Sequence, residues 1–133
     1  ARRNLVAVAE ATVRLADHEP QPTAAQQREL ENLLAAMDRN PYSPPQPDLD
    51  AELLAWALER RRLVRVAEDV YFLPRTYDEL LAWVRTTITA DSVVTVGQMR
   101  DRFGSSRKYA LAFLEHLDER KITRREGEGR VLV

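Results

Sequence analysis

The chain has 133 residues, which is enough for one ordinary domain or two small ones. Its apolar fraction of 44% and charged fraction of 31% exclude an intrinsically disordered protein, and the absence of cysteine excludes disulfides and thiolate metal sites. A net charge of −1 argues against a protein that coats nucleic acid without selection. No apolar run approaches the roughly 18 residues of a membrane span and no signal peptide is visible, so we expect a cytoplasmic protein with no membrane partner.

The chain begins with a segment that is repeated later. Leu5–Leu15 matches Leu63–Leu73, each copy having a β-branched run, a small acidic turn and a second run, and Ile122–Val133 is a more divergent third copy. Three hairpins imply three tandem units: a hairpin remnant at residues 1–16, a penultimate unit at 17–75 and a C-terminal unit at 76–133. We therefore expect a fragment that begins inside a domain; chance similarity of short strands is the alternative.

The penultimate unit is predicted to contain two helical segments and a hairpin. Thr23 and Gln26 form a capping box that opens the first helix, which ends at Asn40-Pro41. Pro41–Pro47 is an extended, stiff loop, and Asp48 or Asp50 caps the next helix. We expect residues 23–73 to form a compact winged helix with a short second helix pair. Trp56 is expected in the core or at a domain interface.

Three consecutive arginines, Arg60–Arg62, close that second helical segment. They either complement the negative end of the helix dipole or contact backbone phosphates, and both interpretations stay open. Only Pro74–Thr76 separates this unit from the next, so we expect a nearly rigid tandem.

The C-terminal unit follows the order helix, strand, helix, turn, helix, hairpin. A capping box at Thr76 and Glu79 is predicted to start its first helix, Ser92–Val94 supplies a short strand, and a second capping box at Thr95 and Gln98 opens another helix. Gly104 stops that helix, and Ser105 or Ser106 caps the last one. Strands at 122–125 and 130–133 flank the turn at 126–129. The fold class is therefore mainly α with small β-hairpins (α+β), built as tandem winged-helix domains, each a helix-turn-helix plus a wing.

Basic side chains gather at the start of the last helix. Residues 100–108 hold four basic residues and one acid, whereas acids cluster in residues 10–31 and 115–119. We expect the nucleic-acid-binding residues to be Gly104, Ser105, Ser106, Arg107, Lys108, Arg124, Arg125 and Arg130, with Arg100, Arg102 and Tyr109 as secondary candidates. Tyr109 is more consistent with core packing than with base stacking. His18 and His116 lack partners at ligand spacing, so we expect no metal site and no cofactor, with His116 on a solvated face.

The same residues carry a family resemblance. The segment from Gly104 to Val133 is similar to the last winged helix of SelB, the selenocysteine-specific translation elongation factor of bacteria. Arg61–Pro74 resembles the end of that family's penultimate winged helix. The matching motif is Gly104–Lys108, an apolar helix to Leu117-Asp118, Thr123–Arg125 and the turn glycines Gly127 and Gly129. The resemblance covers nearly the whole chain, with the last 40 or so residues most specific.

This resemblance implies a function. The family's N-terminal part is a GTPase that carries selenocysteinyl-tRNA, and its C-terminal winged helices grip the SECIS hairpin of selenoprotein mRNA beside a UGA codon. No phosphate-binding P-loop motif occurs in this chain, so the fragment is expected to be no enzyme. We also expect it to act as a monomer and to meet ribosome or tRNA only through the rest of the protein. A DNA-binding transcription regulator and a protein-interaction module remain as alternatives, because fold does not fix function.

Overall fold

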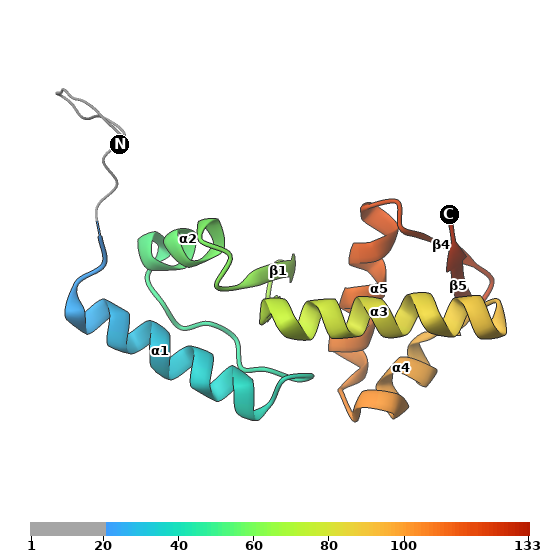
Figure 1. Cartoon of the computed structure of the whole chain (residues 1–133), viewed down its shortest axis with the longest axis horizontal. Helices are drawn as coiled ribbons and strands as arrows, with labels where there is room; N and C mark the ends of the chain where they lie inside the picture. The colour runs from blue at the N-terminus through green and yellow to red at the C-terminus, as the bar shows by residue number, and fades with distance from the viewer. Residues whose placement is uncertain (1–20) are drawn as a thin grey trace, which may run out of the picture.

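The computed structural model describes residues 21–133, and the hairpin predicted for residues 1–16 lies outside them. Within the described part, the elements form an elongated molecule with α1 and α2 at one end, α4, α5 and a small sheet at the other, and α3 running along the second half (Figure 1). None of the described helices is both long and apolar enough to cross a membrane. In chain order the elements are α1 (Ala24–Arg39), α2 (Ala51–Glu59), β1 (Val64–Ala67), β2 (Val70–Phe72), α3 (Pro74–Asp91), β3 (Val94–Thr95), α4 (Val96–Phe103), α5 (Arg107–Glu119), β4 (Thr123–Glu126) and β5 (Gly129–Leu132).

The C-terminal unit has the predicted winged-helix order. Helices α3, α4 and α5 pack on an antiparallel three-stranded sheet of order β3-β5-β4, whose β4–β5 hairpin is the wing. One apolar cluster fills the space between helices and sheet, because each helix turns an apolar face inward. Its fully buried members include Val84, Val94, Met99, Phe113, Leu114 and Leu117. The mixed α+β class and the winged-helix fold are confirmed.

Local sequence signals set the ends of the helix-turn-helix. The backbone N–H of Thr95 donates to Gln98 Oε1 (2.8 Å) and the N–H of Gln98 donates to Thr95 Oγ1 (3.1 Å), which completes the predicted capping box of α4. Gly104 ends α4 in the left-handed region, with φ of 64°, and Ser106 rather than Ser105 caps α5.

The first helix of this unit begins earlier than predicted. The chain enters α3 at Pro74, whose fixed φ and missing N–H suit the first helical position, and Leu73 precedes it without a side-chain cap. Thr76 is therefore inside the helix and buried, so the capping box predicted for Thr76 and Glu79 is wrong.

The penultimate unit, which we call the N-terminal unit from here on, is simpler than predicted. Its α1 starts at the capping box of Thr23 and Gln26, and its α2 starts at Asp50, whose carboxylate accepts the N–H of Leu53 (2.8 Å). The proline-containing segment 41–48 forms turns and extended chain, as predicted for Pro41–Pro47. Helix α2 alone follows it, instead of the predicted short second helix pair. The β1–β2 hairpin then follows, as predicted.

The β1–β2 hairpin joins the two units because its two faces enter different cores. Val66, Val70 and Phe72 belong to the C-terminal cluster, whereas Leu63 and Tyr71 belong to the cluster under α1 and α2. The ring of Phe72 meets that of Phe113 edge-on, with centroids 6.0 Å apart, so β2 packs directly against α5. No linker separates the units, since β2 is followed after one residue by α3.

Candidate nucleic-acid interface

The start of α5 is held by the N-terminal unit. The Ser106 hydroxyl accepts the backbone N–H of Tyr109 (3.4 Å), and the N–H of Ser106 itself donates to Ser43 Oγ (3.1 Å). The Tyr109 hydroxyl donates to the carbonyl oxygen of Pro44 (2.7 Å). Residues 104–108, which we call the helix tip, therefore lie against the loop that connects α1 to α2.

Tyr109 is engaged by the protein. Its half-buried ring lies edge-on to that of Phe72, with centroids 6.2 Å apart, in addition to its hydroxyl bond to Pro44. The side chain thus fills the junction between the units, where packing is the better account of it than base stacking.

The two cations of the helix tip differ in their surroundings. Arg107 is exposed, and among residues 21–133 no hydrogen bond or ion pair occupies its guanidinium. Lys108 forms an ion pair with Asp69 in the β1–β2 turn (Nζ to Oδ2, 2.7 Å), and both side chains stay about half exposed. The hydrogen bond raises the pKa of Lys108 and lowers the pKa of Asp69, so both groups are charged at neutral pH. Neither cation is buried inside an ion-paired interior.

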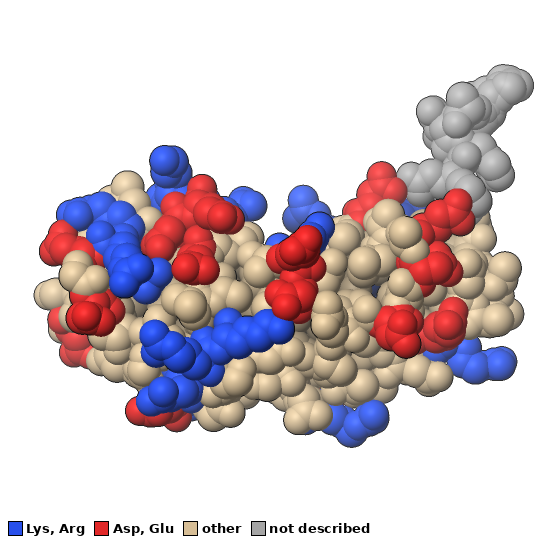
Figure 2. Space-filling view, turned by 180° about the vertical axis from the view of Figure 1, so that it is seen from behind, with Lys and Arg blue, Asp and Glu red and all other residues tan. Residues whose placement is uncertain are grey.

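Helix α4 adds two exposed arginines near the helix tip. Arg100 pairs with its neighbour Asp101 (3.2 Å), and the guanidinium of Arg102 lies 4.8 Å from the centre of the Phe103 ring. On the face shown in Figure 2, basic side chains form a band over the C-terminal unit at the left of the view. Acidic side chains gather on that face over the N-terminal unit at the right. On this face, acidic side chains also lie among the basic ones of the C-terminal unit.

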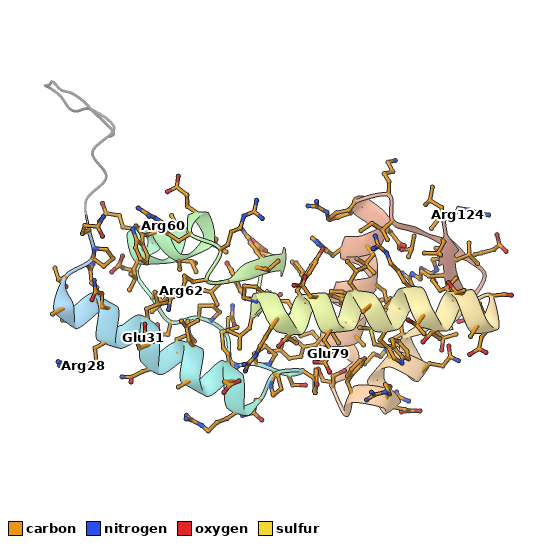
Figure 3. The ribbon with its side chains drawn as sticks, viewed as in Figure 1. Arg28, Glu31, Arg60, Arg62, Glu79 and Arg124 are labelled. Carbon is orange, nitrogen blue, oxygen red and sulfur yellow. The ribbon has the colours of Figure 1, made fainter. Side chains whose placement is uncertain are left out.

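The wing arginines form a separate group. Arg124 is exposed and donates to Glu126 (2.7 Å), and the exposed Arg125 donates through Nε to the carbonyl of Gly127 (3.4 Å). Arg124 lies at the top of the view in Figure 3, whereas α5 begins at the bottom. A helix of 13 residues is about 20 Å long, so one ligand must span roughly that distance to meet both groups.

Arg130 is not at the surface. Its side chain is 3% exposed, and Nε donates to Asp118 Oδ2 (3.2 Å), while Thr123 donates to the other oxygen of the same carboxylate (2.6 Å). The three groups tie the end of α5 to both wing strands. The RNA contact predicted for Arg130 is disfavoured by this burial, because strand alternation does not reveal which face of a short charged hairpin is covered.

His116 is likewise less exposed than predicted. It is half-buried, and its Nε2 lies 2.9 Å from the hydroxyl of Tyr77 in α3. Burial lowers the pKa of His116, with the charge of Arg120 acting in the same direction, so the ring is neutral at pH 7. Within residues 21–133, no cluster of His, Asp or Glu side chains could hold a metal ion.

The contacts made by the connecting loop were not predicted. Tyr42 donates to both carboxylate oxygens of Glu79 (2.9 Å each), and its ring packs on that of Phe103 with centroids 4.8 Å apart and planes tilted by 42°. Ser43 and Pro44 continue this junction to the helix tip. The density of prolines marked the loop as stiff, but nothing local in the sequence shows which surface it covers.

A family model decides the identity of the C-terminal unit. The model described as elongation factor SelB, winged helix, matches residues 87–132. The C-terminal unit is a SelB winged helix. The predicted resemblance to the C-terminal winged-helix region of SelB is thereby confirmed. A selenocysteine-specific elongation factor of Desulfomicrobium baculatum is 31% identical over 80 residues, which cover 60% of this chain and 13% of that relative.

Two solved structures share the tandem fold. The mRNA-binding domain of SelB from E. coli, solved in complex with SECIS RNA, matches with a TM-score of 0.62 and 20% identity over 84% of this chain and 98% of that one. The bacterial selenocysteine-specific elongation factor EF-Sec matches with a TM-score of 0.63 and 18% identity, covering 85% of this chain and 20% of that one. The likeness thus extends beyond the C-terminal unit to the arrangement of both units.

Proposed function

We propose that this chain is the RNA-binding part of a selenocysteine-specific elongation factor and recognises a SECIS hairpin in mRNA, so that selenocysteine is inserted at UGA. The observation that carries the proposal is the match of both units to a SelB domain solved with SECIS RNA. The match of residues 87–132 to the SelB winged helix supports the same function, as does Arg107 at the helix tip, which is exposed and unpaired among residues 21–133.

The geometry favours contact through the helix tip. The major groove of A-form RNA is too deep and narrow for α5 to read, so a winged helix must meet the backbone or bases displaced from a loop or bulge. Within the described residues, the N–H groups of Ser106 and Tyr109 already have acceptors, which leaves those of Arg107 and Lys108 to bind a phosphate at the positive end of the helix dipole. A Cβ atom added at Gly104 would meet nothing within 4 Å, so the backbone there is open to a ligand.

Arg107 is the principal contact in this proposal, with the tip residues 104–106 shaping its approach and Lys108 supplying a second charge. Arg124 and Arg125 would hold a more distant part of the RNA, and Arg100 and Arg102 would add to the local potential. Arg130 and Tyr109 are left out, since both are engaged inside the protein.

The remaining properties follow from this role. The chain acts by binding without catalysis or a cofactor, as a monomer in the cytoplasm, and the GTPase and any contact with ribosome or tRNA belong to the rest of the protein. We retain the division into units at 17–75 and 76–133, supported by the start of α3 at Pro74.

The decisive experiment is a titration of the chain with an RNA hairpin that carries a bulged base and with the same hairpin lacking it. Arg107→Gln is compared with Arg28→Gln, a matched change at an exposed arginine of α1 far from the tip (Figure 3). We expect the Arg107 change to weaken binding of the bulged hairpin by about 1–3 kcal/mol, or about 5- to 150-fold, and the Arg28 change to have little effect.

Equal affinities for the two variants would contradict the assignment of Arg107. Tighter binding of duplex DNA than of hairpin at the same salt concentration would indicate a DNA-binding regulator. Weak binding that does not respond to salt would instead favour a protein-interaction module.

A further inference from the structure

A second group of arginines lies in a groove between the two units. The groove has a volume of about 470 Å³ and is bounded by the end of α2, strand β1, the start of α3 and the second half of α5. Arg61, Arg65 and Arg120 bring three positive charges to it, and Asp78 is the one acid among its lining residues. Strand β1 packs on α5, and the two lie beside each other in Figure 1. This groove is distinct from the helix tip, because it involves the opposite end of α5.

The three arginines of the groove form no ion pair with a carboxylate of any described residue. Two other arginines of this region do have such partners, since Arg62 pairs with Glu31 and Arg75 with Asp38. In Figure 3 Arg62 points toward Glu31 between α1 and α2.

Arg65 is bonded only to neutral groups. Its Nε and Nη2 donate to the carbonyls of Ala67 (3.3 Å) and Glu68 (3.4 Å), which orient the guanidinium without cancelling its charge. Tyr77 and His116 also line the groove, where they are hydrogen-bonded to each other and their rings meet edge-on, and the neutral His116 adds no charge. An oriented guanidinium beside uncharged side chains suits a phosphate group.

Two of the groove arginines, Arg61 and Arg65, occupy positions that recur in the C-terminal unit. Arg61 follows α2 with φ of 58°, and Lys121 follows α5 with φ of 64°. Arg65 Nε donates to the carbonyl of Ala67, two residues on, just as Arg125 Nε donates to that of Gly127. The helix-to-wing junction is thus repeated, and Arg65 is the counterpart of the wing residue Arg125.

Charge also limits where a polyanion can lie. The adjoining groove shares Arg65 and His116 but is lined by Glu68, Glu115 and Glu119, so its acids repel phosphates. A polyanion is therefore confined to the side bounded by Arg61 and Arg120.

We infer that this inter-unit groove binds the phosphodiester backbone of a second RNA segment, apart from the hairpin at the helix tip. The choice of RNA as the polyanion rests on the proposed function and on the repeated junction. The chain then holds two RNA segments at the two ends of α5.

The test uses the whole chain and two RNA probes, a 20-nucleotide oligouridylate and the bulged hairpin, each followed by fluorescence anisotropy. The double variant Arg61→Gln, Arg120→Gln is compared with Arg28→Gln, Arg39→Gln, which removes two exposed charges from α1. We expect the groove variant to bind oligouridylate at least about fivefold more weakly than the control and to bind the hairpin within about twofold of it. The slope of log affinity against log salt should fall by about 1.4, at about 0.7 per phosphate contact.

An equal loss of oligouridylate affinity in the groove and α1 variants overturns the inference. Displacement of oligouridylate by polyglutamate at equal charge concentration also overturns it, because that result would indicate an acidic protein partner. Loss of oligouridylate binding in a chain whose wild type does not bind the hairpin would support the groove and contradict the proposed function instead. Melting curves of all variants show that each is folded.

Discussion

Replacing Arg130 by alanine should lower the free energy of unfolding of the C-terminal unit without changing its affinity for RNA. The guanidinium is buried at 3% exposure and pairs with Asp118, whose side chain is 25% exposed and also accepts from Thr123. Removal of Arg130 leaves that carboxylate facing a partly apolar cavity without its cation.

The magnitude follows from the burial of the two partners. Breaking a fully buried ion pair costs about 3–5 kcal/mol, and breaking an exposed one costs about 0–1 kcal/mol. Water still reaches Asp118, so we expect Arg130→Ala to lower the free energy of unfolding by about 2–4 kcal/mol. Replacing both partners, with Arg130→Met and Asp118→Leu, should cost less than the single change, because no charge is then left unpaired.

Urea titrations followed by circular dichroism measure these differences, with Arg124→Ala as the control at an exposed wing arginine. Hairpin affinity is measured at a temperature where all variants are folded. A cost of less than about 1 kcal/mol for Arg130→Ala, the value of an exposed pair, would contradict a stabilising buried ion pair. A tenfold or greater loss of hairpin affinity in the folded variant would show that Arg130 contributes to RNA binding.

Three further predictions concern the junction and the turns. Asp69→Asn should remove one pH dependence of stability, because the hydrogen bond from Lys108 lowers the pKa of Asp69 in the folded protein. This contribution to stability is fully present above a pH of about 4 and is lost on acidification through the folded pKa. Melting curves from pH 2 to 7 should show this loss in wild type and not in the variant. Tyr42→Phe should lower the free energy of unfolding by about 0.5–1.5 kcal/mol in urea titrations, because the hydrogen bond to Glu79 is lost. Tyr42→Ala should lower it further, because the ring contact with Phe103 is lost as well, and equal costs would contradict a contribution from that contact. Gly129→Ala should lower the free energy of unfolding by about 1–3 kcal/mol, since its Cβ would lie 2.3 Å from Val93 Cγ2 and 3.1 Å from the Val94 carbonyl oxygen. Gly97→Ala in α4 is the control: its Cβ would have no contact closer than 3.9 Å, so this change should be neutral or stabilising in the same assay.

The accuracy of the sequence-based predictions depended on the range of the interaction. The capping boxes of α1 and α4 and the glycine that ends α4 were predicted correctly, because each depends on residues three or four positions apart. The box at Thr76 and Glu79 failed although its spacing was correct. Pro74 offered an earlier start that needs no cap, and the start of α3 at Pro74 left Thr76 to be buried.

The site was predicted only in part, for the same reason. Exposure of Arg107, Arg124 and Arg125 agrees with the expectation that these charges are available, but Arg130 is opposite Arg125 in the ladder and is nevertheless buried. Burial on that face depends on Asp118 at the end of α5, and the hairpin pattern contains no information about it. The contact between Ser43 and Ser106 joins residues 63 positions apart, which no local rule identifies.

The β1–β2 hairpin joins the two units because its residues pack in both cores. In a typical winged helix the wing projects to solvent, but here β2 places Phe72, at 1% exposure, beside Phe113 in the neighbouring core. Burial of such a ring stabilises a fold by about 1.5–3 kcal/mol, and Val66 and Val70 add to it. Separating the units would expose these side chains, so the boundary near residue 75 divides the sequence but not the packing. We therefore expect the helix tip and the inter-unit groove to keep a nearly fixed separation when RNA binds.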